Sequence, residues 1–101
     1  MGHSARQLRS TVTSEGRLEL SLATIEVPDP GSDEVVVRIE ASPINPSDLG
    51  LLFGPSDMRT AKASGTPEEP VVTADIPSHL LAGVAARLDQ SLPVGNEGAG
   101  V

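Results

Sequence analysis

The chain has 101 residues, which is the size of one small domain with a single hydrophobic core. Its formal net charge is −7 and its seven Lys and Arg residues are scattered, which argues against nucleic acid as a partner because phosphate binding requires clustered cations. It contains no cysteine, which excludes disulfides and thiol catalysis and removes the usual ligands of structural zinc. No apolar run is long enough to cross a membrane and no signal-peptide pattern is visible, so we expect no membrane partner and a cytoplasmic protein.

The first elements expected along the chain are strands. Leu8 and Val12 lie among polar residues over positions 5–13, a Ser-Glu-Gly turn follows, and leucines alternate with polar residues over 18–22, which predicts a β-hairpin. A Pro-Asp-Pro-Gly turn at 28–31 then precedes residues 34–41. This segment alternates apolar side chains on one face, and it is the strongest strand prediction in the chain.

The remaining elements are shorter. We expect a helix over residues 49–53, with Ser47 or Asp48 as its cap, and a mobile loop over 54–69, where Pro, Gly and charged residues show no periodicity. Residues 71–76 are expected to form a short strand, and 78–89 a helix with one apolar stripe. The overall expectation is a mainly β protein with short helices.

Few residues of this chain could support catalysis unaided. His3 and His79 stand alone, without a second ligand at metal-binding spacing, so we expect no metal site. There is no Gly-x-Ser-x-Gly nucleophile motif. There is also no Gly-x-Gly-x-x-Gly dinucleotide fingerprint between a strand and a helix.

The polar groups with the most specific setting are Asn45, between Ile44 and Pro46, and Asn96, beside Glu97 in a glycine-rich segment. An amide side chain donates and accepts at once, which suits a site that orients a carbonyl or carboxamide without ionising. The alternative is that both asparagines and Asp48 only satisfy backbone groups in turns.

Three separate segments together resemble the amino-terminal catalytic domain of the medium-chain dehydrogenase/reductases. They are the Pro-Asp-Pro-Gly turn at 28–31, the run from Glu34 to Asp48 that includes Ala-Ser-Pro-Ile-Asn-Pro-Ser-Asp, and the Gly-Asn-Glu-Gly-Ala-Gly-Val segment at 95–101. The resemblance covers residues 8–54 and 92–101. It implies that residues 1–101 form a GroES-like partial β-barrel, with an insertion over 55–90 made of a loop and a helix.

The same resemblance implies a zinc-free enzyme. In zinc-dependent members of the family, the positions matching Asn45 and Asn96 are a cysteine and a histidine that bind the metal, and both are asparagine here. The zinc-free branch includes NADPH-dependent quinone oxidoreductases and 2-enoyl-thioester reductases. By this resemblance Asn45, Asp48 and Asn96 are catalytic residues, Asn45 and Pro46 contact NADPH, and Glu97 is structural.

One departure from the family pattern separates these two activities. The enoyl reductases use a tyrosine shortly after Asn-Pro-Ser-Asp to deliver a proton, but the chain has no tyrosine and offers only Ser56 nearby. An unassisted serine hydroxyl is a poor general acid. We therefore expect hydride transfer from NADPH to a small-molecule quinone or another activated carbonyl or alkene, with the enoyl-thioester reductase as the alternative.

A second departure concerns the cofactor. In the family a Rossmann nucleotide-binding domain follows this segment, and none of it is present in the 101 residues. We expect a catalytic-domain portion truncated before the Rossmann domain and inactive alone, whose full-length form is compatible with a homodimer. A short, non-catalytic binding module is the other alternative.

Overall fold

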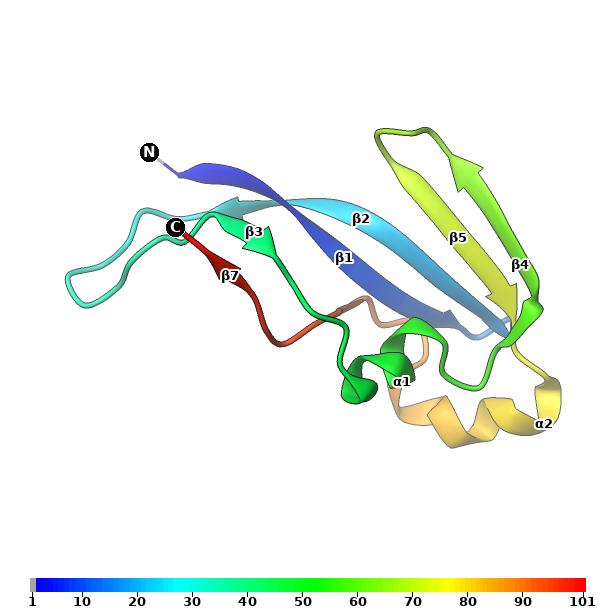
Figure 1. Ribbon diagram of the computed structural model, residues 1–101. Helices are drawn as coiled ribbons and strands as arrows, with labels where there is room; N and C mark the ends of the chain where they lie inside the picture. The colour runs from blue at the N-terminus through cyan, green and yellow to red at the C-terminus, as the bar shows by residue number, and fades with distance from the viewer. Residues whose placement is uncertain (1) are drawn as a thin grey trace.

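A long β-hairpin forms the centre of the molecule. The computed structural model describes residues 2–101. Strands β1 (His3–Thr13) and β2 (Arg17–Val27) run antiparallel, with Leu8 opposite Leu22 and Val12 opposite Leu18 (Figure 1). The predicted hairpin is confirmed, and both strands extend further than the apolar alternation indicated.

Further strands extend this hairpin into a five-stranded sheet. Its order is β4-β5-β2-β1-β6, with β4 at Asp57–Gly65, β5 at Pro70–Asp75 and β6 at Leu92–Pro93. Strand β5 confirms the short strand expected over 71–76. The expectation of an irregular loop over 54–69 is wrong, because β4 occupies much of it and pairs with β5.

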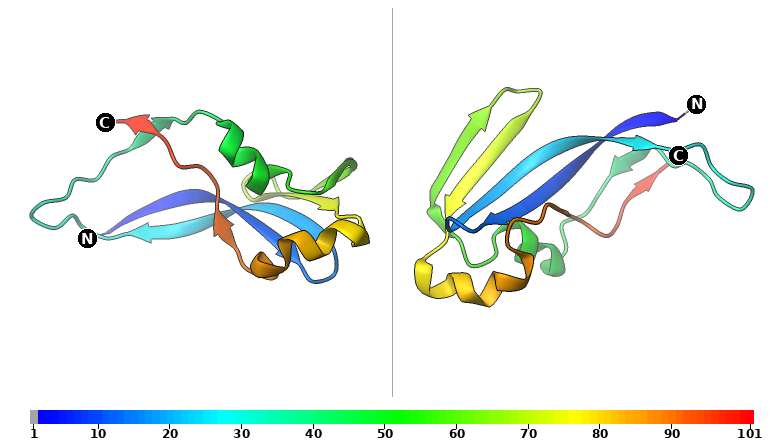
Figure 2. Two further views of the ribbon diagram at one scale, coloured as in Figure 1. Left: turned by 90° about the horizontal axis from the view of Figure 1, so that it is seen from below. Right: turned by 180° about the vertical axis from the view of Figure 1, so that it is seen from behind.

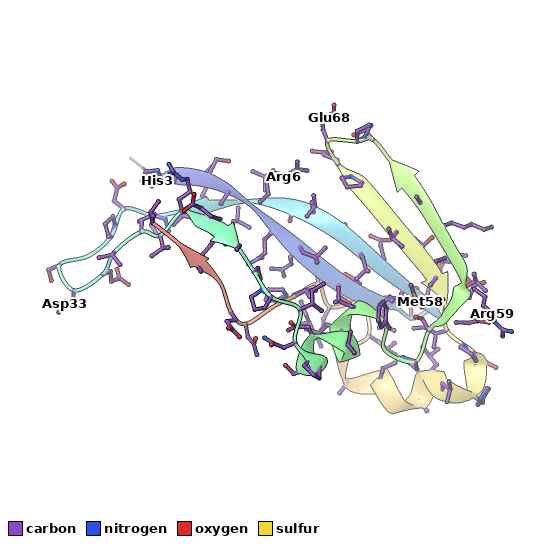
Figure 3. The ribbon with its side chains drawn as sticks, viewed as in Figure 1. His3, Arg6, Asp33, Met58, Arg59 and Glu68 are labelled. Carbon is purple, nitrogen blue, oxygen red and sulfur yellow. The ribbon has the colours of Figure 1, made fainter. Side chains whose placement is uncertain are left out.

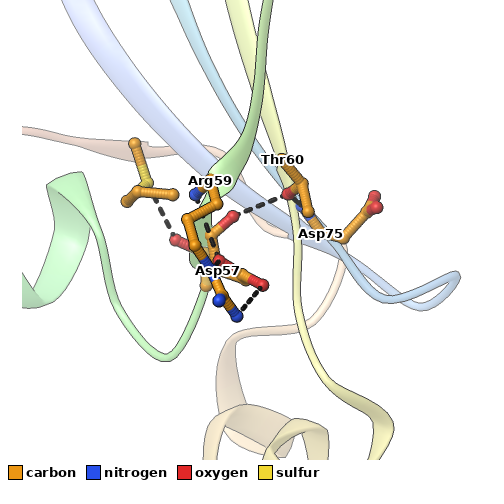
Figure 4. A network of polar contacts seen from close by, with 6 residues as sticks. Asp57, Arg59, Thr60 and Asp75 are labelled. Carbon is orange, nitrogen blue, oxygen red and sulfur yellow. Dashed lines mark hydrogen bonds and ion pairs between the residues drawn. The ribbon is translucent and has the colours of Figure 1, made fainter.

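Polar contacts fix the start of β4 against β5. The Thr60 hydroxyl donates a hydrogen bond to the Asp57 carbonyl (2.6 Å) and accepts one from the Asp75 amide (2.7 Å) (Figure 4). The Asp57 carboxylate also accepts bonds from the side chain of Arg59 at 3.0 Å. Backbone pairing and side-chain hydrogen bonds therefore build this hairpin without an apolar pattern in β4.

A second, two-stranded sheet holds the other predicted strand. Strands β3 (Ile39–Ala41) and β7 (Ala99–Gly100) pair antiparallel, and Arg38 exchanges two backbone hydrogen bonds with Val101, at 2.7 and 3.1 Å. A side chain at Gly100 would overlap the Arg38 carbonyl, so glycine permits this close approach. The prediction of a full strand over 34–41 is wrong for residues 34–38, since a strand needs a partner and only the end of this segment has one.

Short helices cover one end of the sheet. A 3-10 turn, η1 (Pro46–Asp48), leads into α1 (Leu49–Leu52), which confirms the helix expected near 49–53. The helix expected over 78–89 divides into α2 (Ser78–Leu81) and the 3-10 segment η2 (Ala82–Arg87) (Figure 2). Val84, inside η2, has the non-helical angles φ −118° and ψ 19° and marks a kink there.

The buried core lies where these helices meet the hairpin. Val12, Leu18 and Ile76 form it, and Leu81, Val84 and Leu88 pack against it. Within residues 2–101 neither sheet closes on itself. The molecule is mainly β and elongated, with extents of 49 × 28 × 22 Å.

One buried hydroxyl connects three elements beside this core. Ser10 on β1 is fully buried, and its hydroxyl donates to the Leu51 carbonyl of α1 at 2.6 Å. The Arg87 guanidinium of η2 donates to the same Ser10 oxygen at 2.8 Å. Burial lowers the pKa of Arg87 from its ordinary value, and its buried Nε has no hydrogen-bond partner.

Candidate functional site

Two segments far apart in the sequence meet at one place. The Asn45 side-chain amide donates a hydrogen bond to the Glu97 carboxylate at 3.0 Å, across 52 positions of the sequence. The Ser42 hydroxyl donates to the Glu97 backbone carbonyl at 2.8 Å. Side-chain contacts with Glu97 thus hold the Ala-Ser-Pro-Ile-Asn-Pro-Ser-Asp segment against the Gly-Asn-Glu-Gly segment.

The local fold of the first segment explains the positions of its polar groups. Asn45 is extended (φ −93°, ψ 157°), and the fixed φ of Pro46 suits the first position of the 3-10 turn that follows. The Asp48 carboxylate accepts a hydrogen bond from the Asn45 amide (2.8 Å), while the Asp48 amide donates to the Asn45 carbonyl (2.9 Å). Asp48 is 5% exposed, so this reciprocal pair fixes its carboxylate in place.

The two segments form a wall of a groove, and β1 contributes to it as well. The groove has a volume of about 680 Å³, and its polar lining includes Arg6, Gln7, Ser42, Asp48, Asn96 and Glu97. Apolar side chains such as Leu8, Ile44 and Leu52 complete it. A cavity of this size, mostly apolar with a few convergent polar groups, fits a small organic molecule.

Charges of both signs line the groove. Arg6 is its one lining cation among the described residues, and the guanidinium also donates a hydrogen bond to the Glu68 carbonyl at the tip of the β4–β5 hairpin (Figure 3). Asp48 and Glu97 supply carboxylates. Each already accepts a hydrogen bond from Asn45: Asp48 from its backbone amide and Glu97 from its side-chain amide. Asn96 has a neutral amide that can both donate and accept.

The structure brings some of the predicted site residues together and not others. Asp48 and Asn96 line the groove, and Asn45 adjoins it through its bond to Glu97. Pro46 starts the 3-10 turn and is not a lining residue.

Sequence reasoning missed the contribution of β1. Arg6 and Gln7 lie in a strand that only its hairpin pattern identifies, and no local motif marks them as site residues. Glu97 was expected to be structural, and it is the acceptor that joins the two segments.

Within residues 2–101 no three His, Asp or Glu side chains converge in a way that could hold a metal ion. No helix formed by these residues combines the length and apolar character that crossing a membrane requires. Ser56 donates its hydroxyl to the Phe53 carbonyl and does not line the groove.

No protein-family model matches the chain, and no curated protein is significantly similar to it in sequence.

Proposed function

We propose that this chain is the GroES-like, amino-terminal part of an NADPH-dependent, zinc-independent oxidoreductase that acts on quinones or other activated carbonyls and alkenes. The observation that carries the proposal is the Asn45–Glu97 hydrogen bond. It joins the two segments on which the family resemblance rests, and it does so at the edge of a groove of suitable size. The β3–β7 pairing and this hydrogen bond together bring the two motifs to one edge of the groove.

The groove residues fit the nicotinamide end of the cofactor. A carboxamide offers one acceptor and two donor hydrogens, and the Asn96 amide can donate to that acceptor while the Glu97 carboxylate accepts from the donors. NADPH, when bound, supplies the hydride, and the protein's contribution is to orient the nicotinamide ring and substrate and to limit their contact with water. In this proposal Asn45 positions Glu97, while Asp48 holds the loop that forms the groove wall.

The rest of the cofactor has no equivalent site in these 101 residues. They contain no Gly-x-Gly-x-x-Gly turn that could bind a pyrophosphate at a helix amino terminus. We therefore assign this role to a Rossmann domain outside the sequence described. The 101-residue chain alone is expected to bind NADPH weakly and to be inactive toward quinones.

The 2-enoyl-thioester reductase remains a weaker reading of the same resemblance. That chemistry needs a side chain that can donate a proton to the substrate. The nearby candidate, Ser56, donates its hydroxyl hydrogen to the Phe53 carbonyl instead. A non-catalytic binding module would use the same groove without any turnover.

Two halves of the cofactor, offered separately, test the proposal. Reduced nicotinamide mononucleotide, added to ¹⁵N-labelled chain at up to ~10 mM, should shift the amide signals of Ser42, Asp48, Asn96 and Gly98. Adenosine 2′,5′-bisphosphate, which carries the other half, should leave these signals unchanged. An Asn96→Ala variant should weaken the nicotinamide response, while Ser47→Ala, an exposed residue outside the groove, should not. The proposal fails if the nicotinamide compound shifts no groove signal, or if both halves shift them equally.

A further inference from the structure

Residues 34–38 form an extended segment in which, within residues 2–101, Arg38 alone pairs with another strand. Their sequence is Glu-Val-Val-Val-Arg, and they lead directly into β3 (Figure 1). In the described part of the chain the amides of Val35, Val36 and Val37 have no backbone hydrogen-bond acceptor, whereas Arg38 is paired with Val101. Unpaired strand edges are templates for pairing with another chain.

The side chains of this edge are unusually exposed for their type. Val35 is 83% exposed, Val37 47% and Ile39 57%. Because side chains alternate along an extended segment, these three share one face, and Glu34, Val36 and Arg38 share the other. The edge thus offers an apolar face together with free backbone groups.

The order of these residues is self-complementary. If two copies pair antiparallel with Val36 opposite Val36, then Val35 of each copy lies opposite Val37 of the other. In the same register Glu34 of each copy lies opposite Arg38 of the other, which gives two cross-strand pairs of opposite charge. A two-fold symmetric contact requires this kind of match, since the same patch must fit itself.

The existing hydrogen bonds leave room for such pairing. The Arg38 backbone groups point toward Val101, so those of Val35 and Val37 point to the opposite side of the strand. Pairing through Val35 and Val37 therefore competes with no contact of β7. One oxygen of the Glu34 carboxylate accepts a bond from the Gly31 amide at 2.9 Å, and Oε2 is the one we assign to the partner's guanidinium.

We infer that this chain forms a symmetric dimer by antiparallel pairing of residues 34–38 with the same residues of a second copy. The occupant of the edge is thus another copy of this chain. The contact is short, so the association is weak and depends on concentration.

Charge-reversed variants test both the dimer and its register. Analytical ultracentrifugation of the 101-residue chain from ~10 to ~1000 µM should show a shift from 10.4 kDa toward twice that mass. Arg38→Glu and Glu34→Arg each place like charges opposite one another twice per dimer, so each should weaken self-association about tenfold or more. Mixing the two single variants should restore association, because every cross-strand pair is then of opposite charge. Lys62→Glu makes the same charge change as Arg38→Glu on exposed β4, and it should leave the dimer unchanged.

Circular dichroism of each variant distinguishes misfolding from loss of strand pairing. The mixing experiment is a second control, because two misfolded variants would not regain association when mixed. A chain that stays monomeric throughout this range would overturn the inference. So would a dimer that all variants form equally, or a mixture that associates no better than its components. Continuous growth beyond the dimer would also overturn it, since a closed two-fold contact ends at two copies.

Discussion

The guanidinium of Arg87 and the hydroxyl of Ser10 lie 2.8 Å apart, although 77 positions separate them in the sequence. Ser10 is fully buried, and its own hydrogen is donated to the Leu51 carbonyl. Three elements, β1, α1 and η2, are therefore joined through one oxygen atom.

Replacing Ser10 with alanine should destabilise the protein by about 1–3 kcal/mol, because the Leu51 carbonyl and the buried end of Arg87 both lose a partner. Urea unfolding measures the loss. Ser4→Ala is the matched control on the same strand, since Ser4 is exposed, and it should change stability by less than about 0.5 kcal/mol. Equal effects at the two positions would show that the Ser10 network adds nothing.

Removing both partners should cost less than the two single losses together. The double variant Ser10→Ala with Arg87→Leu leaves no buried guanidinium to satisfy, so its destabilisation should fall short of the sum by about 0.5–3 kcal/mol. Unfolding curves of the four proteins give this coupling energy. Simple additivity would contradict the direct contact.

The hydrogen bond between Asn45 and Glu97 should form only when one side chain has a donor group and the other an acceptor. Asn45→Asp places a carboxylate against the Glu97 carboxylate, and it should loosen the two segments more than Asn45→Ala, which only removes the donor. Adding Glu97→Gln to Asn45→Asp reverses donor and acceptor and should restore the contact. Hydrogen exchange at the Arg38 and Val101 amides, which each donate to the other residue's carbonyl, reports the separation of the two segments. A double variant that exchanges as fast as Asn45→Asp would refute the assignment.

Arg59 should control the titration of Asp57. Hydrogen bonds from the Arg59 side chain, then from its backbone amide, hold the pKa of Asp57 below 3.8. A carboxyl with a lower pKa in the folded state stabilises the fold above its unfolded pKa, and this contribution is lost as pH falls through the folded value. Titration of the carboxyl carbon signal should give a midpoint below 3.8 that rises in Arg59→Gln. Lys62→Gln, on the same strand, should leave it unchanged; a rise there too would contradict a specific role for Arg59.

Gly65 at the end of β4 should be sensitive to substitution. It has φ +77°, and a side chain there would overlap the Glu69 carbonyl, so Gly65→Ala should destabilise the protein by more than about 1 kcal/mol. At Gly83 a side chain would meet no atom within 4 Å, so Gly83→Ala should be neutral or stabilising by up to about 1 kcal/mol. Thermal unfolding compares the two. Tolerance of alanine at Gly65 would mean that this turn does not form as described.

Apolar alternation was enough to predict the β1–β2 hairpin, because its pattern reports burial against the core at Val12 and Leu18. It failed for β4, which lies at the sheet edge with most of its side chains exposed, so that backbone pairing and side-chain hydrogen bonds define the strand. At Val35–Val37 the same alternation predicted a strand that does not form, because these residues have no partner strand among residues 2–101.

The candidate site was only partly predictable for a related reason. Asn45, Asp48 and Asn96 stand in recognisable local motifs. Arg6 and Gln7 reach the same groove only because β1 is long enough to extend from the core to the β3–β7 end, and no local pattern encodes that distance.

The uneven distribution of buried side chains along the molecule has a consequence for its dynamics. Val12, Leu18, Ala74 and Ile76 lie at one end, while the groove wall around β3 and β7 has Asp48 as its one buried residue within 2–101 and depends on exposed hydrogen bonds. Such a region can open as a separate unit while the core stays folded. A ligand in the groove should therefore slow amide exchange at Arg38 and Val101 at concentrations too low to raise the melting temperature of the whole chain.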